Sequence, residues 1–286
     1  MNGSVFRGLH TGYLCLVLAL LVLPLVALVP MSFSPTATVV AWPAPWSTKW
    51  YEDVAASPDW RSALGWSLLT ATFASAIATT TGYLGAMAIV RAGARGSAAL
   101  QLLVLSPMMV PQVVVALSTY VLASSLGLHG HWLILAVGQS LLGLPVAAMI
   151  IAASLRGIHE TVLRAGISLG GSRSQVFWRI VFPMALHGIL SAAALSFMIA
   201  FDELLIALFL ATPRLQTLPV RIYESVHYEL NPAVAVVSVL LTALLCSTVV
   251  LNQLFWWSKA RLADSEPSTQ ADTGVFERSD QRKRLH

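Results

Sequence analysis

Charged residues are scarce in this chain. They make up 10% of its 286 residues, whereas a soluble domain of ordinary composition carries about 25%. Hydrophobic residues account for 57%, and the mean hydropathy is +0.74. The shortage of charge argues against a water-soluble domain, and the composition predicts a protein that is embedded in a membrane.

Residue patterns for catalysis are missing as well. The sequence contains no G-x-x-x-x-G-K-[ST], and its only lysines, Lys49, Lys259 and Lys283, follow no glycine-rich loop. The chain therefore cannot be its own P-loop ATPase. The histidines lie in loops or at the ends of apolar runs, without metal-ligand spacing, so the serines inside the runs have no histidine at membrane depth to activate them. We expect no catalytic residue, no metal and no cofactor.

Cysteine is limited to two residues, Cys15 and Cys246, and each lies within an apolar run. Free cysteine in such a position behaves as a small hydrophobic residue. We therefore expect both side chains to be buried, and we expect neither a disulfide nor a metal pair.

What the chain has instead is a series of apolar runs about twenty residues long, enough to cross a hydrocarbon core of about 30 Å. In lipid such runs must be helical, because no backbone group can be left unpaired there. The first run could be a secretory signal, but it is long and no cleavage pattern follows it, so we expect a retained helix. The six runs are 13–31, 66–90, 100–125, 132–154, 183–210 and 233–257. The predicted fold is an all-α polytopic membrane protein with six transmembrane helices.

Basic residues are unevenly distributed between the segments that connect these runs. Of the seventeen, only Lys49, Arg61, Arg214 and Arg221 lie in the first, third and fifth connections, among acidic residues. The others lie at the two ends of the chain and in the second and fourth connections. By the positive-inside rule, both termini are predicted to be cytoplasmic.

The chain is predicted to have three parts. Residues 1–60 hold the first helix and an outer loop rich in proline and tryptophan, as is usual at a membrane interface. Residues 61–258 hold the remaining helices, and residues 259–286 are polar enough to predict a disordered tail. Pro107, Pro111, Gly143 and Pro145 would kink or thin two of the helices, either around a cavity or as ordinary packing kinks.

The connection at 156–182 is predicted to contain two short helices. Val162, Gly166 and Leu169 are spaced as one face of the first helix. Gly170 and Gly171 would end it, because glycine adopts the left-handed conformation at little cost. The sequence SRSQ at 172–175 is a capping box that begins the second helix. Its apolar side is formed by Val176, Phe177, Ile180 and Val181.

This connection resembles a segment of a known family. The sequence LRAGISLGGS at 163–172, followed by Pro183, is similar to the cytoplasmic "EAA" loop of ABC-importer permease subunits. The similarity extends over residues 61–257 and includes PMMVP at 107–111, GLPV at 143–146 and AFDELLIALFLATPRLQTLP at 200–219.

The resemblance implies a site for coupling to an ATPase, because the family's loop supplies a helix that docks in a groove of the ATPase subunit. The family's Glu-Ala-Ala is similar in position to Arg164-Ala165-Gly166, so a basic residue replaces the acidic one. The residues that match the loop are Leu163, Arg164, Ala165, Gly166, Leu169, Gly170, Gly171 and Ser172.

The resemblance also implies partners and a location. ATP would be hydrolysed by a separate dimer of ATP-binding subunits, a second homologous permease would complete the path, and an extracytoplasmic solute-binding protein would deliver the solute. The chain would lie in bacterial inner-membrane lipid, with no nucleic-acid partner. The segment at 200–223 looks like the spermidine/putrescine branch, which implies a polyamine substrate; permeases for iron, thiamine or opines look similar and remain alternatives.

Asp202 and Glu203 are unusual because they lie within the fifth apolar run. A carboxylate at the bilayer centre costs about 2.5 to 3.5 kcal/mol on insertion scales, so neither should face lipid. Either the helix kinks near Phe201 and the carboxylates cap it or pair with Arg214 or Arg221, or Phe201, Asp202 and Glu203 line a translocation path for a cation. Both hypotheses can hold together.

Two other classes of function remain open. In a stand-alone secondary transporter the 155–182 connection would be a plain linker, although the inverted repeats typical of that class are not evident. In a membrane anchor or sensor the basic tail would bind anionic lipid. Only a permease requires a stoichiometric ATPase, so co-purification distinguishes the three.

Overall fold

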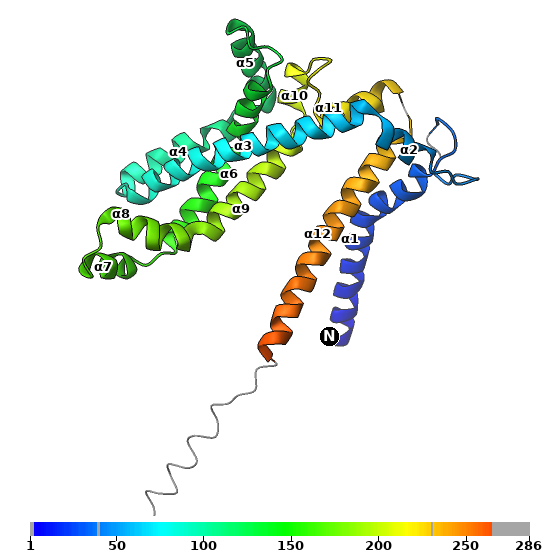
Figure 1. Cartoon of the computed structure of the whole chain (residues 1–286). Helices are drawn as coiled ribbons and strands as arrows, with labels where there is room; N and C mark the ends of the chain where they lie inside the picture. Colours follow the sequence, from blue (N-terminus) through cyan, green and yellow to red (C-terminus); the bar gives the residue numbers. More distant parts are fainter. Residues whose placement is uncertain (1–2, 39–40, 230, 265–286) are drawn as a thin grey trace, which may run out of the picture. The chain divides into compact units, whose positions relative to one another are not determined.

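The computed structural model describes residues 3–38, 41–229 and 231–264 (Figure 1). These residues form two compact units. The larger contains Thr36–Val39 and Thr48–Val234, and the smaller contains Met1–Pro35, Val40–Ser47 and Ala235–His286. In the described part of the chain the regular elements are all helical, apart from one isolated bridge between Thr212 and Leu215. The predicted all-α class is confirmed.

Three long helices form the centre of the larger unit: α3 (Pro58–Arg91), α6 (Trp132–Arg156) and α9 (Phe182–Phe201). They pack through small residues, which let helix backbones approach closely in a membrane. A Cβ atom on Gly143 of α6 would lie 3.1 Å from Ser196 Cβ and 3.2 Å from Ala78 Cβ. Gly143 therefore thins α6 at the point where it meets both neighbours, and Pro145 is buried within the unbroken helix.

The third apolar run is broken in the structure. It forms α4 (Ala94–Met109) and α5 (Gln112–Ser125), which meet at an angle of 87°. Val110 between them is extended, as expected of a residue before a proline, and Pro111 precedes the first residue of α5. The kink predicted from the prolines is confirmed, and it divides the run into two helices.

The fifth apolar run is also broken, because α9 ends at Phe201 and α10 (Leu205–Leu210) begins three residues after Asp202. One core cluster contains Val115 and Ala116 of α5 together with Ile206, Ala207 and Leu210 of α10. The chain continues through α11 (Leu218–Glu224) and the π-helical turn η2 (Ser225–Glu229).

The predicted outer loop contains more helix than its composition indicates. α2 (Lys49–Ala56) lies within it, and α3 begins at Pro58, well before the expected start of the second apolar run. Trp60 is buried, and the guanidinium of Arg221 lies over its ring at 5.5 Å from the centroid. A tryptophan predicted to lie at a membrane interface is thus part of the protein core.

The smaller unit contains α1 (Gly3–Ser32) and α12 (Ala233–Asp264). Both cysteines are free and exposed on these helices, so the expectation that they are buried is wrong. α1 presents apolar side chains outward over most of residues 10–29, and α12 does so between Leu240 and Val250, as helices in lipid can. α12 extends to Asp264, so residues 259–264 of the predicted tail are helical, and the rest of that tail lies outside the described residues.

The number of spans is confirmed in part. Four helical segments in the described residues are long and apolar enough to cross a membrane, and the bent α4–α5 pair makes up to five. Ala233–Thr248 is a shorter apolar helical stretch. Six runs are therefore helical, but six complete spans are not established.

Candidate functional site

The connection at 156–182 contains α7 (Glu160–Ser168), α8 (Arg173–Val176) and the π-helical turn η1 (Phe177–Val181), named together the α7–α8 hairpin. Its turn begins with a Schellman motif at the end of α7. Gly170 N donates to Ile167 O at 2.9 Å, and Gly171 N donates to Gly166 O at 3.1 Å. Gly170 has φ +85°, so the predicted left-handed glycine is confirmed.

The turn ends in the predicted capping box. Gln175 N donates to Ser172 Oγ at 3.2 Å, and Ser172 N donates to Gln175 Oε1 at 2.9 Å. Hydrogen bonds within the turn thus satisfy some of the free carbonyl groups at the end of α7 and some of the free N–H groups at the start of α8. These bonds give the turn a defined geometry. The following π-helical turn was not predicted, and such turns are frequent at functional sites.

The two helices of the hairpin pack closely at Gly166. A Cβ atom there would lie 2.9 Å from Ile180 Cδ1 and 3.1 Å from Val176 Cγ2, so only a very small residue fits without rearrangement. The predicted apolar side of the second helix is confirmed, because Val176 is buried and Phe177, Ile180 and Val181 are half-buried.

The predicted face of α7 is only partly correct. Val162 and Gly166 are half-buried, but Leu169 is 89% exposed because the helix has ended there. Trp178 is also exposed, and Arg164 forms an exposed ion pair with Glu160 at 3.0 Å. Leu169 therefore presents an apolar side chain at the turn of the hairpin, and Arg164 presents a basic side chain on α7 before that turn.

The two carboxylates of the fifth run lie in different environments. Glu203 is buried and caps α10, where its carboxylate accepts from Ile206 N at 2.7 Å and from Ala207 N at 3.1 Å. It also accepts from Gln112 Nε2 at 3.2 Å. The capping hypothesis is thus correct for Glu203, although the arginine partners are wrong: Arg221 pairs with Glu229 at 2.9 Å and, more distantly, with Glu224.

Asp202, by contrast, is exposed at the end of α9. Phe197 and Phe201, one turn apart on the same helix, stack with ring centroids 5.8 Å apart. The break therefore holds one buried structural carboxylate and one accessible carboxylate, the latter adjoining an aromatic pair.

Gln112 is the site residue that sequence reasoning missed. It is the first residue of α5, and its side chain reaches Glu203 across 91 positions of sequence. The proline before it signalled the helix break, but no local pattern signals a partner so distant in the chain. In the described residues, no group of three or more His, Cys, Asp or Glu side chains could hold a metal ion.

A bundle of apolar helices with two broken spans and a capped connecting hairpin is the architecture of a membrane transport subunit. The fold is similar to that of a chain in the crystal structure of a bacterial ABC transporter involved in the import of the acidic polysaccharide alginate. The TM-score is 0.68 with 16% sequence identity, covering 90% of this chain and 96% of that one.

Residues 78–256 match the family model described as binding-protein-dependent transport system inner membrane component. The chain belongs to this family. It is a permease subunit of an ABC importer, as the resemblance of its sequence implied.

Curated relatives cover most of the chain. The putrescine transport system permease protein PotI of Escherichia coli K12 is 30% identical over 245 residues, which are 83% of this chain and 86% of PotI. The spermidine/putrescine transport system permease protein PotC is 28% identical in the same organism, over 91% of this chain and 97% of PotC. PotC of Haemophilus influenzae is 30% identical, over 86% and 95%.

Proposed function

We propose that this chain forms half of the translocation path of an ATP-driven importer for a polyamine such as spermidine or putrescine. A homologous permease supplies the other half, a separate pair of ATP-binding subunits hydrolyses ATP, and an extracytoplasmic binding protein delivers the solute. Both termini lie in the cytoplasm, because the basic residues gather on that side. The domain that performs this function is residues 61–258.

The α7–α8 hairpin is the element that an ATP-binding subunit would grip. Its Schellman motif and capping box fix the turn between two helices, and its packing at Gly166 joins them. Because η1 is followed directly by α9, a displacement of the hairpin would be transmitted to a membrane-spanning helix. Leu169, exposed at the turn, offers an apolar side chain to a groove on the partner.

The translocation path is proposed to pass the break between α9 and α10. Asp202 carries this proposal, because it is an exposed carboxylate at the end of an apolar helix, next to the stacked rings of Phe197 and Phe201. A polyamine combines ammonium groups with methylene stems. A carboxylate and aromatic faces are groups that favour such a cation without a deep binding site. Glu203 supports the path by fixing α10, and it does not contact the solute.

The substrate is inferred from the names of the relatives together with this carboxylate. The test is uptake of radiolabelled putrescine and spermidine by the full transporter with its own binding protein. We expect Asp202→Asn to lower uptake while the complex still assembles, and Asp202→Glu, which keeps the charge, to retain most of it. Unchanged uptake in Asp202→Asn would remove Asp202 from the path. If wild type takes up iron, thiamine or an opine instead of a polyamine, the substrate is wrong.

A further inference from the structure

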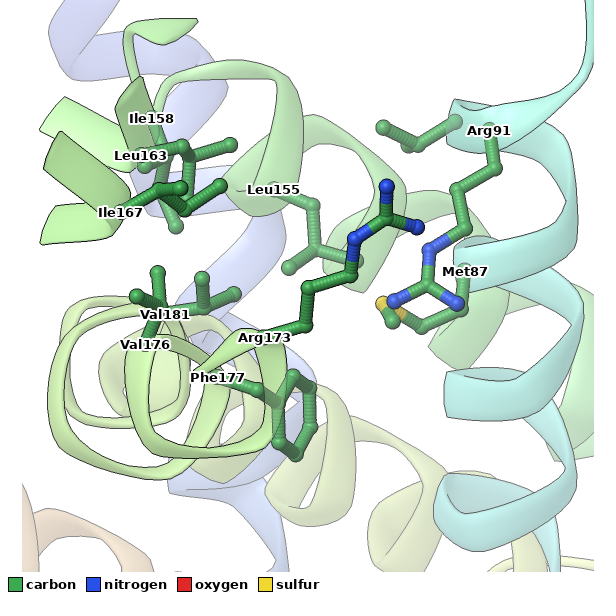
Figure 2. A pocket seen from close by; sticks show the side chains of 11 residues that line it. Met87, Arg91, Leu155, Ile158, Leu163, Ile167, Arg173, Val176, Phe177 and Val181 are labelled. Carbon is green, nitrogen blue, oxygen red and sulfur yellow. The ribbon is translucent and has the colours of Figure 1, made fainter. Parts of the chain in front are cut away.

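A cavity of about 310 Å³ lies between the α7–α8 hairpin and the ends of α3 and α6 (Figure 2). Its wall is mostly apolar and includes Met87 and Val90 of α3, Leu155 of α6 and Val176 of α8. Figure 2 shows that two arginines, Arg91 from the end of α3 and Arg173 from the start of α8, both reach into this space.

The two arginines have no acidic partner in the part of the chain that the structure describes. Neither takes part in an ion pair there, and no lining residue of the cavity is acidic. The carboxylate of Glu160, the first residue of α7, is already paired with Arg164. Arg91 and Arg173 are exposed residues, so the cavity is open at their side. Two guanidinium groups at the open edge of an apolar cavity are complementary to an anion that carries a large apolar group.

A second hollow of about 470 Å³ continues the cavity along α3. It shares Met87, Arg91 and Phe177 with the first and adds Tyr83 and Leu84, which lie two turns further into the helix. From Arg91 to Tyr83 the distance along the helix axis is about 12 Å. The combined surface is thus an elongated apolar track that begins at a pair of positive charges.

Tyr83 adds one polar group to the wall of the second hollow. Its hydroxyl is buried and has no hydrogen-bond partner among the described residues. A buried polar atom of this kind costs free energy unless something pairs with it. The hydroxyl would gain an acceptor if the side chain turned toward a ligand oxygen in the second hollow, while Arg91 and Arg173 hold a negative charge.

The depth of the cavity fits the membrane surface. α6 has 25 residues and is therefore about 37 Å long, which lies between the thickness of the hydrocarbon core, about 30 Å, and that of the whole bilayer, about 40–45 Å. Leu155 is the next-to-last residue of α6, so in a bilayer that α6 spans we expect this end of the helix at the level of the lipid headgroups.

We propose that this cavity binds an anionic phospholipid, with its phosphate held by Arg91 and Arg173 and an acyl chain along α3 toward Tyr83. The lipid would then be a structural part of the joint between the α7–α8 hairpin and the spans. An acidic side chain of a partner protein would satisfy the arginines, but it would leave the apolar track along α3 without an occupant. The proposal does not depend on the substrate or on the role of the hairpin in coupling.

The test uses the assembled transporter in nanodiscs of phosphatidylcholine with a small fraction of photoactivatable lipid. Phosphatidylglycerol and phosphatidylcholine probes carry the same diazirine acyl chain, and cross-linked peptides are identified by mass spectrometry. We expect the phosphatidylglycerol probe to label the peptides that contain Met87 and Phe177 preferentially. Each arginine should contribute about fivefold to this preference, so Arg91→Gln with Arg173→Gln should lower it about 25-fold.

A matched control removes the same charge elsewhere. Arg95 and Arg156 are exposed and line neither hollow, so Arg95→Gln with Arg156→Gln should keep the preference. Equal labelling by both probes, or equal loss in the two double variants, would show ordinary surface lipid and overturn the proposal. Labelling that occurs in the permeases alone and disappears when the ATP-binding subunits are present would overturn it too, because a protein side chain would then fill the cavity. Gel filtration of each variant verifies assembly independently of labelling.

Discussion

Substitution of Gly170 by valine tests the proposed role of the α7–α8 hairpin most directly. A Cβ atom at Gly170 would meet nothing within 4 Å, so the substitution creates no clash with neighbouring side chains. The cost comes from the backbone, because φ is +85° and an L residue pays about 1–2 kcal/mol in the left-handed region, with β-branched residues at the upper end. A penalty of this size lowers the ratio of native to altered turn about 5- to 30-fold.

The altered turn would lose the two hydrogen bonds of the Schellman motif, and α7 would no longer be held in one orientation on α8. We therefore expect Gly170→Val to assemble with its partners but to lose most uptake and the stimulation of ATP hydrolysis by binding protein. The assay is uptake and ATP hydrolysis in liposomes, with co-purification as the measure of assembly.

Gly93 provides a matched control for this experiment. It also precedes a helix and has open space around it, but its φ is −62°, which valine can adopt. Gly93→Val should behave like wild type. Wild-type uptake in Gly170→Val would refute the reasoning, and an equal loss in Gly93→Val would show that backbone strain at Gly170 is not the cause.

Three further substitutions test the packing described above. Glu203→Leu leaves two buried backbone donors, Ile206 N and Ala207 N, without an acceptor, at about 1–3 kcal/mol each. The thermal transition of the purified complex should therefore fall by several degrees, whereas Asp202→Asn should leave it unchanged; equal transitions would contradict the cap. Gly143→Leu should prevent packing of the central helices and reduce the amount of the permease in the membrane, measured by immunoblot. Gly12 has open space around it, so Gly12→Leu should leave that amount unchanged. Ser172→Ala should cost about 1 kcal/mol of hairpin stability, visible as faster amide exchange at residues 173–175; unchanged exchange would show that the cap is dispensable.

Local features of the sequence predicted local structure well. The left-handed glycine and the capping box were predicted because each depends on a few neighbouring residues whose side chains decide the backbone conformation. The prolines at 107 and 111 marked the site of a helix break for the same reason. They did not predict its angle of 87°, because the angle depends on what α5 packs against.

Features that depend on distant residues were not predictable in this way. The sequence left two hypotheses for Glu203. Its cap on α10 is a local feature, but its third partner, Gln112, is remote in the chain. The composition of the outer loop predicts that Trp60 lies at the membrane interface, but Arg221, which is remote in the chain, lies over its ring. Leu169 has the spacing of a buried position, but helix periodicity has no meaning beyond the residue at which the helix ends.

The bond between Gln112 and Glu203 joins the two broken spans at their breaks. Gln112 directly follows the bend that leads into α5, and Glu203 lies in the bend that leads into α10, so the two bends are one hydrogen bond apart. α5 and α10 also share a core cluster, so they pack against each other as well as being linked at their breaks. We therefore expect a displacement at either broken span to move both helices together.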